Sequence, residues 1–357
     1  MSEQRTLLAD MIDRLCRDAA AAPGFDPSSD AWLADVWRQA AALGLTALLV
    51  PEADGGIGGT WEDAVIVQHA VGYHCLALPI GEAMVASALL AGGAAAVPDG
   101  ITGMAFWSDA PMLAGGPIPR FTGILRRVPW GRHLDHVVTI VPRGDAPQVV
   151  LLPCKVAASV RGGRNLAGEP RDDLQFVDAP VTAASCGRPE AIALFAYGAL
   201  LRIASGAGAL SALLARSVQH AKERSQFGRP IGDFQAIQQQ LAVVAGEAAA
   251  VACASRTAGK AAAVGEAGFE IAAAKLRANQ AIDACTGIAH QVHGAIGFTR
   301  EHGLHHLTQR LWSWRTEFGN DRYWANRLGA LVAARGGDAF WPDLTGRADR
   351  VGGISPI

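Results

Sequence analysis

Two segments in the C-terminal half of the chain combine side chains that suit the binding of a phosphate-bearing cofactor. The first, ERSQFGRPIGDFQ, contains Arg224, and the second, QVHGAIGF, begins at Gln291. The planar guanidinium of arginine pairs with two phosphate oxygens at once and keeps its proton. Gly294, Ala295 and Gly297 leave the backbone after Gln291 open to close approach by a ligand. The simpler interpretations are a charge at a helix end for Arg224 and an interhelical turn for the small residues.

A lone carboxylate and a group of histidines could also do chemistry. Glu247 stands alone in the apolar stretch LAVVAGEAAAVACA, where burial would perturb its pKa, although a pair with Arg or Lys of a neighbouring helix is the interpretation we favour. Five of the ten histidines fall within 290–306, namely His290, His293, His302, His305 and His306. No HExxH motif or cysteine ligand accompanies them, and a structural zinc site needs four ligands. We therefore expect no metal site.

Other catalytic signatures are absent from the sequence. The chain has no G-x-S-x-G or G-x-x-x-x-G-K-S/T motif and no internal repeat, which excludes the common serine hydrolase and P-loop classes. The glycine-rich run at 55–59 lacks the G-x-G-x-x-G spacing after a strand that a dinucleotide fold requires.

The elements that would position these residues change in type along the chain. Helical spacing runs from residue 5 to about 100, with one face of the opening helix formed by Leu7, Leu8, Met11, Ile12 and Leu15. N-cap residues at 26–30 precede a second helix, and two more are expected at 63–72 and 82–90. Between 99 and 187 the apolar runs are short and β-branched, as at 136–141 and 148–152, and predict strands.

Helical spacing returns after Pro189. One long helix is expected to end near 228–230, followed by long helices at about 231–264 and 267–292 and a shorter one from about Asp321. The chain is therefore expected to be helical, then β, then helical.

Composition limits the possible partners and compartment. Half of the 357 residues are hydrophobic and 18% are charged, which excludes a disordered chain. The net charge of -2 gives no basic surplus for nucleic acid. The most membrane-like run, 76–98, is interrupted by Pro, Glu and Gly, so we expect no membrane span. The charged N-terminus lacks a signal peptide and the six cysteines form no C-x-x-C pair, so we expect a cytoplasmic protein.

The two C-terminal segments resemble the acyl-CoA dehydrogenase family. The family pattern R-x-x-FG-x-x-I-x-x-FQ matches Arg224, Phe227, Gly228, Ile231, Phe234 and Gln235. The family pattern Q-x-x-GG-x-G matches Gln291, Gly294, Ala295 and Gly297, with alanine in place of one glycine. The opening LGL, VPEADGGIGG and LALPIGEA segments also look like this family, so the resemblance spans nearly the whole chain in the right order.

The resemblance implies a mostly α fold in three domains that binds FAD. These are a helical N-terminal domain at 1–98, a small middle β domain at 99–187, and a C-terminal four-helix bundle at 188–357 through which subunits pair around FAD. The implied cofactor-binding residues in the bundle are Arg224, Gln226, Phe227, Phe234, Gln235, Gln291, Gly294 and Ala295.

The middle domain departs from the family pattern. The family's T-E-P-x-x-G-S-D segment is replaced by AFWSDAP at 105–111, where Ser108 is the candidate flavin contact. The family's flavin-stacking tryptophan is represented by Trp130 in VPWG, which could equally be an aromatic plug between sheet and helices. The β region is also shorter than usual for the family.

The family's chemistry needs a carboxylate that removes the substrate α-proton. Counted from Arg310, the usual position falls near Gly319 or Asn320, and Glu317 lies two residues early. Glu317 is the candidate base, with a salt bridge to Arg315 or Arg322 as its alternative role. Glu247 and Glu223 are the further candidates, and Glu223 also fits a surface i,i+4 pair.

Three functions follow from the resemblance. The first is FAD-dependent α,β-dehydrogenation of an acyl-CoA thioester, in fatty acid or steroid catabolism. The second is the same reaction by one subunit of a mixed dimer or tetramer whose other chain supplies missing contacts. The third is a non-catalytic or repurposed subunit without the flavin chemistry. For the first two we expect an electron acceptor such as an electron-transfer flavoprotein, and the short middle domain leaves room for a ring-bearing acyl group.

Overall fold

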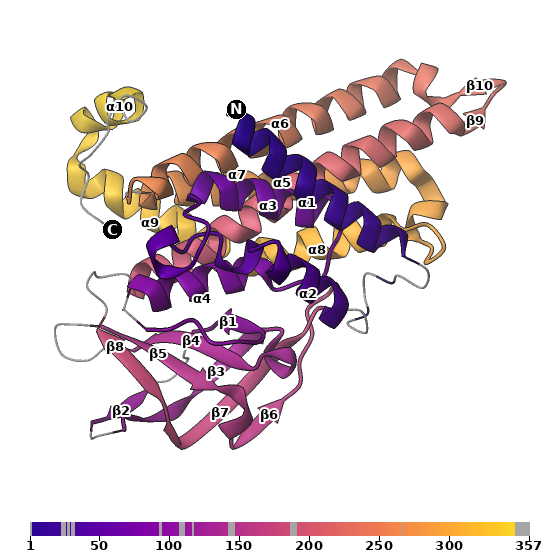
Figure 1. The fold of residues 1–357 in the computed structure, drawn as a ribbon. Coiled ribbons are helices and arrows are strands. Elements are labelled where there is room, and N and C mark those ends of the chain that lie inside the picture. The colour runs from indigo at the N-terminus through magenta and orange to yellow at the C-terminus, as the bar shows by residue number, and fades with distance from the viewer. Residues whose placement is uncertain are drawn as a thin grey trace. The chain divides into compact units, whose positions relative to one another are not determined.

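The chain packs into two units (Figure 1). The structure is a computed structural model that describes residues 2–22, 26, 29, 33–92, 95–106, 111–115, 118–141, 147–185, 191–265 and 267–346. A helical unit comprises Met1–Cys16, Val65–Leu76 and Ala199–Ile357, and a sheet unit comprises Arg17–Ala64 and Ala77–Gly198. Both units draw on separated stretches of sequence, and the division at 98 and 187 therefore stays a prediction about domains.

The N-terminal helices form where the spacing predicted them. They are α1 (Glu3–Ala21), α2 (Leu33–Ala42), α3 (Trp61–Tyr73) and α4 (Ile80–Gly92). Helix α1 buries Ile12, Leu15 and Cys16 but leaves Leu7 exposed, so the apolar face is narrower than expected. Helix α4 is buried nearly all round, in keeping with its almost wholly apolar sequence.

Small residues let α3 lie against α5 (Ala191–Glu223) at backbone distance. A Cβ atom on Gly72 would lie 1.9 Å from the Ser205 carbonyl oxygen, and one on Gly208 would lie 1.9 Å from the His69 carbonyl oxygen. The Ser205 hydroxyl also donates a 3.0 Å hydrogen bond to Gln68 Oε1. Any larger residue at either glycine would push the helices apart, so this crossing fixes α5 in the helical unit.

Four helices share the core of the C-terminal bundle. Helices α5, α6 (Gln235–Ala263), α7 (Gly268–His293) and α8 (Leu304–Thr316) all contribute to one buried apolar cluster (Figure 1). Helices α9 (Asp321–Arg335) and α10 (Gly337–Gly346) follow. Helix α8 was not predicted from the sequence, because its histidines and polar residues obscure the period of Leu304, Leu307 and Leu311, which are fully buried.

The sheet unit contains two four-stranded sheets. The first has the order β1-β4-β5-β8, formed by β1 (Thr102–Met104), β4 (His136–Val141), β5 (Gln148–Pro153) and β8 (Thr182–Ser185). The second has the order β2-β3-β7-β6, formed by β2 (Met112–Ala114), β3 (Arg120–Pro129), β7 (Arg171–Pro180) and β6 (Ser159–Arg161). Among the described strand pairs, β1–β4 is parallel and the others are antiparallel. The strands predicted at 136–141 and 148–152 are both present.

Two described helices are long and apolar enough to cross a membrane. In Leu194–Glu223 the most apolar 18-residue window is 83% buried, as in the core helix of a globular protein. In Gln235–Ala263 the corresponding window is only 28% buried, which leaves most of α6 on the surface of this chain. One or two such helices are weak evidence for a membrane span.

Candidate functional site

The end of α5 leads into an exposed hairpin that carries the first predicted cofactor segment. Strands β9 (Ser225–Gln226) and β10 (Arg229–Pro230) form the hairpin (Figure 1). Its turn residue Phe227 adopts a positive φ of 53° and is 92% exposed. The Phe227 and Phe234 rings meet edge to face at 6.2 Å, and the guanidinium of Arg229 lies 4.2 Å from the centre of the Phe234 ring. A large apolar ring this exposed suits contact with a ligand or a second chain.

The charged and amide residues of this segment are available for binding. The side chains of Arg224, Gln226 and Gln235 are exposed. Within the described part of the chain, Arg224 takes part in no ion pair, although its backbone carbonyl accepts a 2.8 Å hydrogen bond from Ile231. The hairpin therefore holds the backbone of Arg224 in place and leaves its guanidinium accessible.

The second predicted segment forms the turn after α7. Gly294 ends the helix with φ of 64°, and residues Gly294–Phe298 form a 3-10 turn in which Gly294 and Ala295 are exposed. Gln291 is exposed on the last turn of α7. Phe298 is 74% exposed and stacks on the His290 ring with centroids 4.4 Å apart. Gly294 and Ala295 therefore present an accessible backbone, whereas Gly297 is buried, and a Cβ atom on it would lie 2.9 Å from Cβ of His293.

The two segments lie at the same end of the bundle. Arg216, near the end of α5, donates a 3.0 Å hydrogen bond to the carbonyl of Gly303, in the loop that follows the turn. One α5 turn later, the His220 ring stacks on His293 of α7 at 4.4 Å. The fold thus brings together two segments that are more than sixty residues apart in the sequence.

Glu317 lies at the other end of the bundle, in a buried ion pair. Its Oε2 atom accepts a 2.6 Å hydrogen bond from Nε of Arg202, on α5, and the two side chains are only 7% and 6% exposed. The partner is therefore Arg202, whereas the sequence analysis named Arg315 or Arg322. Arg315 instead pairs with Asp283 and Asp321. Burial explains the difference, because α5 is packed against the start of the turn after α8.

A buried lysine completes this cluster. Nζ of Lys275 donates to the carbonyl oxygens of Trp314, at 2.5 Å, and Arg315, at 3.3 Å. Burial lowers the pKa of Lys275 to about 7, against the attraction of the Glu317 carboxylate, which raises it. Neither Arg202 nor Lys275 was among the residues predicted for a site. Their signal was a single charge within an otherwise apolar helical stretch, in ALLRIASG and IAAAKL.

The turn after Glu317 is fixed by its own contacts. Phe318 and Gly319 have positive φ angles of 53° and 97°. A Cβ atom on Gly319 would lie 2.4 Å from Nε1 of Trp324, which donates a 2.9 Å hydrogen bond to the Phe318 carbonyl. The Asn320 side chain caps α9 by accepting from the backbone of Tyr323. These contacts hold Glu317 facing the bundle interior.

The other candidate carboxylates are also engaged. Glu247 on α6 pairs with Arg277 on α7, which is the interhelical pair that the sequence analysis favoured. Glu223 accepts a hydrogen bond from the Gln219 side chain four residues earlier and is exposed. Glu317 and Glu247 are therefore each held by an arginine, whereas Glu223 is exposed and lines a pocket beside His220 and His302.

The two candidates of the middle region have different outcomes. Trp130 is only 4% exposed, in a left-handed turn with φ of 61° after β3, so its ring contacts protein on nearly all sides. The turn is held by a 2.7 Å hydrogen bond from the Arg132 amide to Asp172. Burial would raise the pKa of Asp172, but hydrogen bonds from Arg132 and Gly163 bring it below its usual value. Ser108 lies outside the described residues.

Comparison with known proteins agrees with this fold. Family models for the acyl-CoA dehydrogenase N-terminal and C-terminal domains match residues 2–97 and 187–330. The acyl-CoA dehydrogenase IpdE2 of Mycolicibacterium smegmatis is 26% identical over 348 residues, covering 93% of this chain and 100% of the relative.

Solved structures share the architecture at low sequence identity. The ChsE4-ChsE5 complex from Mycobacterium tuberculosis and the Tcur3481-Tcur3483 steroid ACAD each match with a TM-score of 0.79 and 23% identity, over 93% of this chain and 98% of theirs. The predicted mostly α fold, with a small β region and a C-terminal helical bundle, is confirmed. The chain belongs to the acyl-CoA dehydrogenase family, a class of oxidoreductases.

Proposed function

We propose that this chain is the flavin-holding subunit of a mixed acyl-CoA dehydrogenase oligomer. The reaction is FAD-dependent removal of two hydrogens from a CoA thioester, at the α and β carbons. One observation carries the proposal: the residues assigned to flavin binding are exposed at one end of the bundle, whereas the candidate base Glu317 is buried in an ion pair and Glu247 is also paired with an arginine. Among the described residues, the two buried or half-buried candidates are thus engaged, and the exposed Glu223 is the remaining one.

The exposed residues fit FAD chemically. Arg224 would hold pyrophosphate oxygens, since its guanidinium is accessible and engages no carboxylate in the described part of the chain. Gln291 offers an amide beside a turn of small residues, and Phe227 offers an apolar ring to a flat partner. Bound FAD would supply the acceptor for the hydride that leaves the substrate β-carbon. The protein's part is to bind and orient the cofactor and to exclude water.

The base is proposed to come from the partner chain. A general base must come within hydrogen-bond distance of the proton that it removes. The Glu317 carboxylate is almost wholly buried and engaged by Arg202, so a thioester would have to displace a buried cation to reach it. Glu247 is engaged by Arg277. Both carboxylates therefore fit a structural role better than proton abstraction.

The exposed apolar surface of this chain also fits an interface with a second chain. Most of α6 is exposed despite its apolar sequence, and the neighbouring hairpin exposes Phe227. The ChsE4-ChsE5 structure is a complex of two named chains, and the Tcur3481-Tcur3483 protein is described as a steroid ACAD. We extend both features to this chain and propose a hetero-oligomer that acts on a ring-bearing CoA thioester in the cytoplasm and passes electrons to an electron-transfer flavoprotein.

Co-expression tests the proposal directly. The chain would be purified alone and together with a second acyl-CoA dehydrogenase chain from the same source, and the visible spectrum and oligomeric state of each preparation recorded. We expect a colourless chain alone and a yellow complex that dehydrogenates a steroid-type CoA thioester with an artificial electron acceptor.

Two outcomes would overturn it. A chain that alone binds one FAD per subunit and turns over the thioester would leave no role for a partner. A complex that forms but stays colourless and inactive would favour a non-catalytic subunit.

A further inference from the structure

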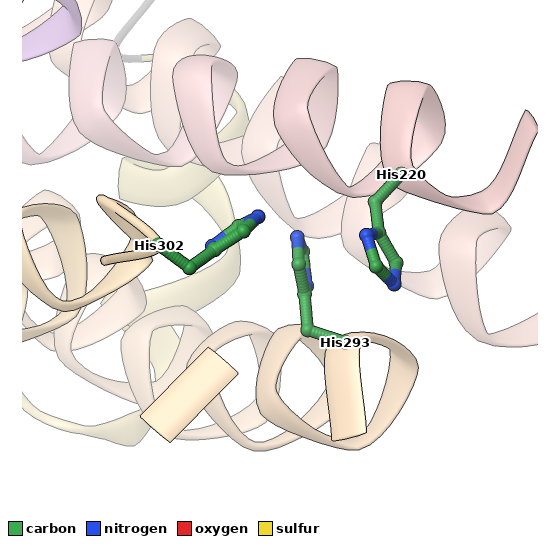
Figure 2. Close-up of side chains that lie close together, drawn as sticks. All are labelled: His220, His293 and His302. Carbon is green, nitrogen blue, oxygen red and sulfur yellow. The ribbon is translucent and has the colours of Figure 1, made fainter. Parts of the chain in front are cut away.

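Three histidines from separate segments converge beside the exposed end of the bundle. His220 comes from the last turns of α5, His293 from the last residue of α7, and His302 from the loop before α8; Figure 2 shows His293 between the other two. One ring nitrogen from each lies within 4.8 Å of those of the other two. The His293 and His302 rings are 4.8 Å apart between centroids, at 64° to each other.

His293 is held in the form that a metal ligand requires. Its Nδ1 lies 2.7 Å from the carbonyl oxygen of Ala289, and because a carbonyl oxygen only accepts hydrogen bonds, Nδ1 carries the proton. The Nε2 atom of the neutral ring then presents a lone pair to the cluster. His293 is 5% exposed, and its Nε2 has no hydrogen-bond partner among the described residues. Metal-bound histidines commonly have this second hydrogen bond to a backbone carbonyl.

A second ring of the cluster also has a nitrogen available to a metal ion. A buried Nδ1 of His302 likewise has no hydrogen-bond partner in the described structure. Neutral imidazoles with accessible lone pairs are the protonation state that binds metal ions.

The cluster opens to a small pocket. The pocket has a volume of about 260 Å³ and is lined by Arg216, Gln219, His220, Glu223, His302 and Gly303. A cation can therefore enter from solvent, and the Glu223 carboxylate offers negative charge at the rim. The positive charge of Arg216 would repel a cation in this pocket, but its guanidinium donates a hydrogen bond to the carbonyl of Gly303.

We propose that His220, His293 and His302 bind a divalent transition metal ion, with Zn²⁺ as the best fit. Three imidazoles and an open position for water or a carboxylate form a common tetrahedral zinc site. Tetrahedral binding brings ligand nitrogens to about 3.3 Å from one another, so rotation of the half-buried His220 and His302 side chains must close the present separation.

This site departs from the expectation of no metal. The expectation rested on the spacing of the histidines within 290–306, which matches no metal-ligand motif. His220 lies seventy residues before His290, so the spacing within that segment could not include it. Tertiary packing supplies the third ligand. The ion would link the end of α5, the end of α7 and the loop before α8, and so brace the end of the bundle that carries Arg224 and Gln291.

Metal titration of the chain tests the site without reference to activity. The untagged or Strep-tagged chain would be stripped with a chelator and titrated with Zn²⁺ by calorimetry, with bound zinc and melting temperature measured in parallel. We expect one Zn²⁺ per chain and a higher melting temperature with Zn²⁺ than with chelator. The variant His220→Gln/His302→Gln, which keeps the buried His293, should lose at least tenfold in affinity and the thermal shift.

A matched control separates this site from adventitious binding. His133→Gln removes a histidine of the sheet unit, outside the cluster, and should bind Zn²⁺ as the wild type does. Equal zinc binding by the wild type and the double variant would overturn the proposal, and so would a wild-type chain that binds none. Because the readouts are zinc content and melting temperature, they are independent of whether the chain binds FAD.

Discussion

The two ends of the C-terminal bundle differ in whether their charged side chains are buried or exposed. At one end, Arg202, Lys275 and Glu317 are buried and satisfy one another and the nearby carbonyl groups. At the other end, Arg224 and Gln291 are exposed beside the exposed ring of Phe227. The same three helices, α5, α7 and α8, reach both ends (Figure 1).

The buried end should contribute mainly to the stability of the chain, and the exposed end mainly to binding. A buried ion pair that loses one member leaves an uncompensated charge in the interior, so the first end is a requirement for folding. An exposed arginine costs little to remove from the free chain, so we expect changes at the second end to affect binding of a ligand or partner more than stability. Substitutions at the two ends should therefore move different measurements.

The largest expected effect is at the buried end. Glu317→Ala leaves Arg202 buried without its partner and should lower the free energy of unfolding by about 3–5 kcal/mol, measured by urea denaturation. Arg202→Met combined with Glu317→Leu should recover part of this loss, because both charges are then gone. Glu223→Ala, an exposed glutamate of the same bundle, serves as the control and should change stability by less than about 0.5 kcal/mol.

A catalytic Glu317 would behave differently. Glu317→Gln would then keep its stability and lose about a hundredfold or more in turnover, the usual scale for loss of a general base. That result in an active complex would make Glu317 the catalytic base and exclude a purely structural role for it.

A pH effect of intermediate size is expected at the histidine end. The pKa of folded His293 is lowered to about 4, below the ordinary value of 6.5, so the unfolded chain binds the proton first as pH falls. Stability from this residue is fully present above pH 6.5 and is lost as pH falls toward 4, in total by about 3 kcal/mol.

The difference between wild type and His293→Gln isolates this contribution from that of the carboxylates. Urea denaturation in the presence of a chelator should show the wild-type advantage shrinking between pH 6.5 and 4. A difference that stays constant across this range would contradict the burial of a neutral His293.

Arg224→Ala tests whether the exposed end of the bundle binds FAD. Loss of a charge-assisted hydrogen bond to phosphate should weaken FAD binding by about tenfold to a hundredfold, while the melting temperature of the cofactor-free chain stays unchanged. Fluorescence titration of FAD into the assembled protein measures the affinity. Lys260→Ala, an exposed cation near the far end of α6, is the control. Unchanged FAD affinity in a folded Arg224→Ala protein would remove Arg224 from the site.

The smallest effect is expected for the half-exposed pair. Glu247→Gln removes a charge from the pair with Arg277, whose side chains are 23% and 35% exposed, so solvent screens much of the interaction. We expect a loss of at most about 1 kcal/mol by urea denaturation. A loss as large as that of Glu317→Ala would mean that exposure does not distinguish these pairs.

The sequence by itself determined the class of fold and the location of the two segments that we propose bind FAD. Hydrophobic period and turn residues are local properties, and they located α1, α5, α7 and the strands at 136–141 and 148–152. The family patterns around Arg224 and Gln291 are likewise contiguous. The one bundle helix that was missed, α8, has its buried leucines among histidines and polar residues, so local composition obscured its period.

Only the tertiary structure decided which distant side chains meet. The partner of Glu317 proved to be Arg202, 115 residues away, because α5 packs against the turn after α8, and no local spacing records that contact. The same packing brings His220 to His293 and His302. Burial also determined the charge states of these side chains, because an ionisable group in an apolar helix must be paired or lose its charge. Which of the two occurs depends on the side chains of the neighbouring helices.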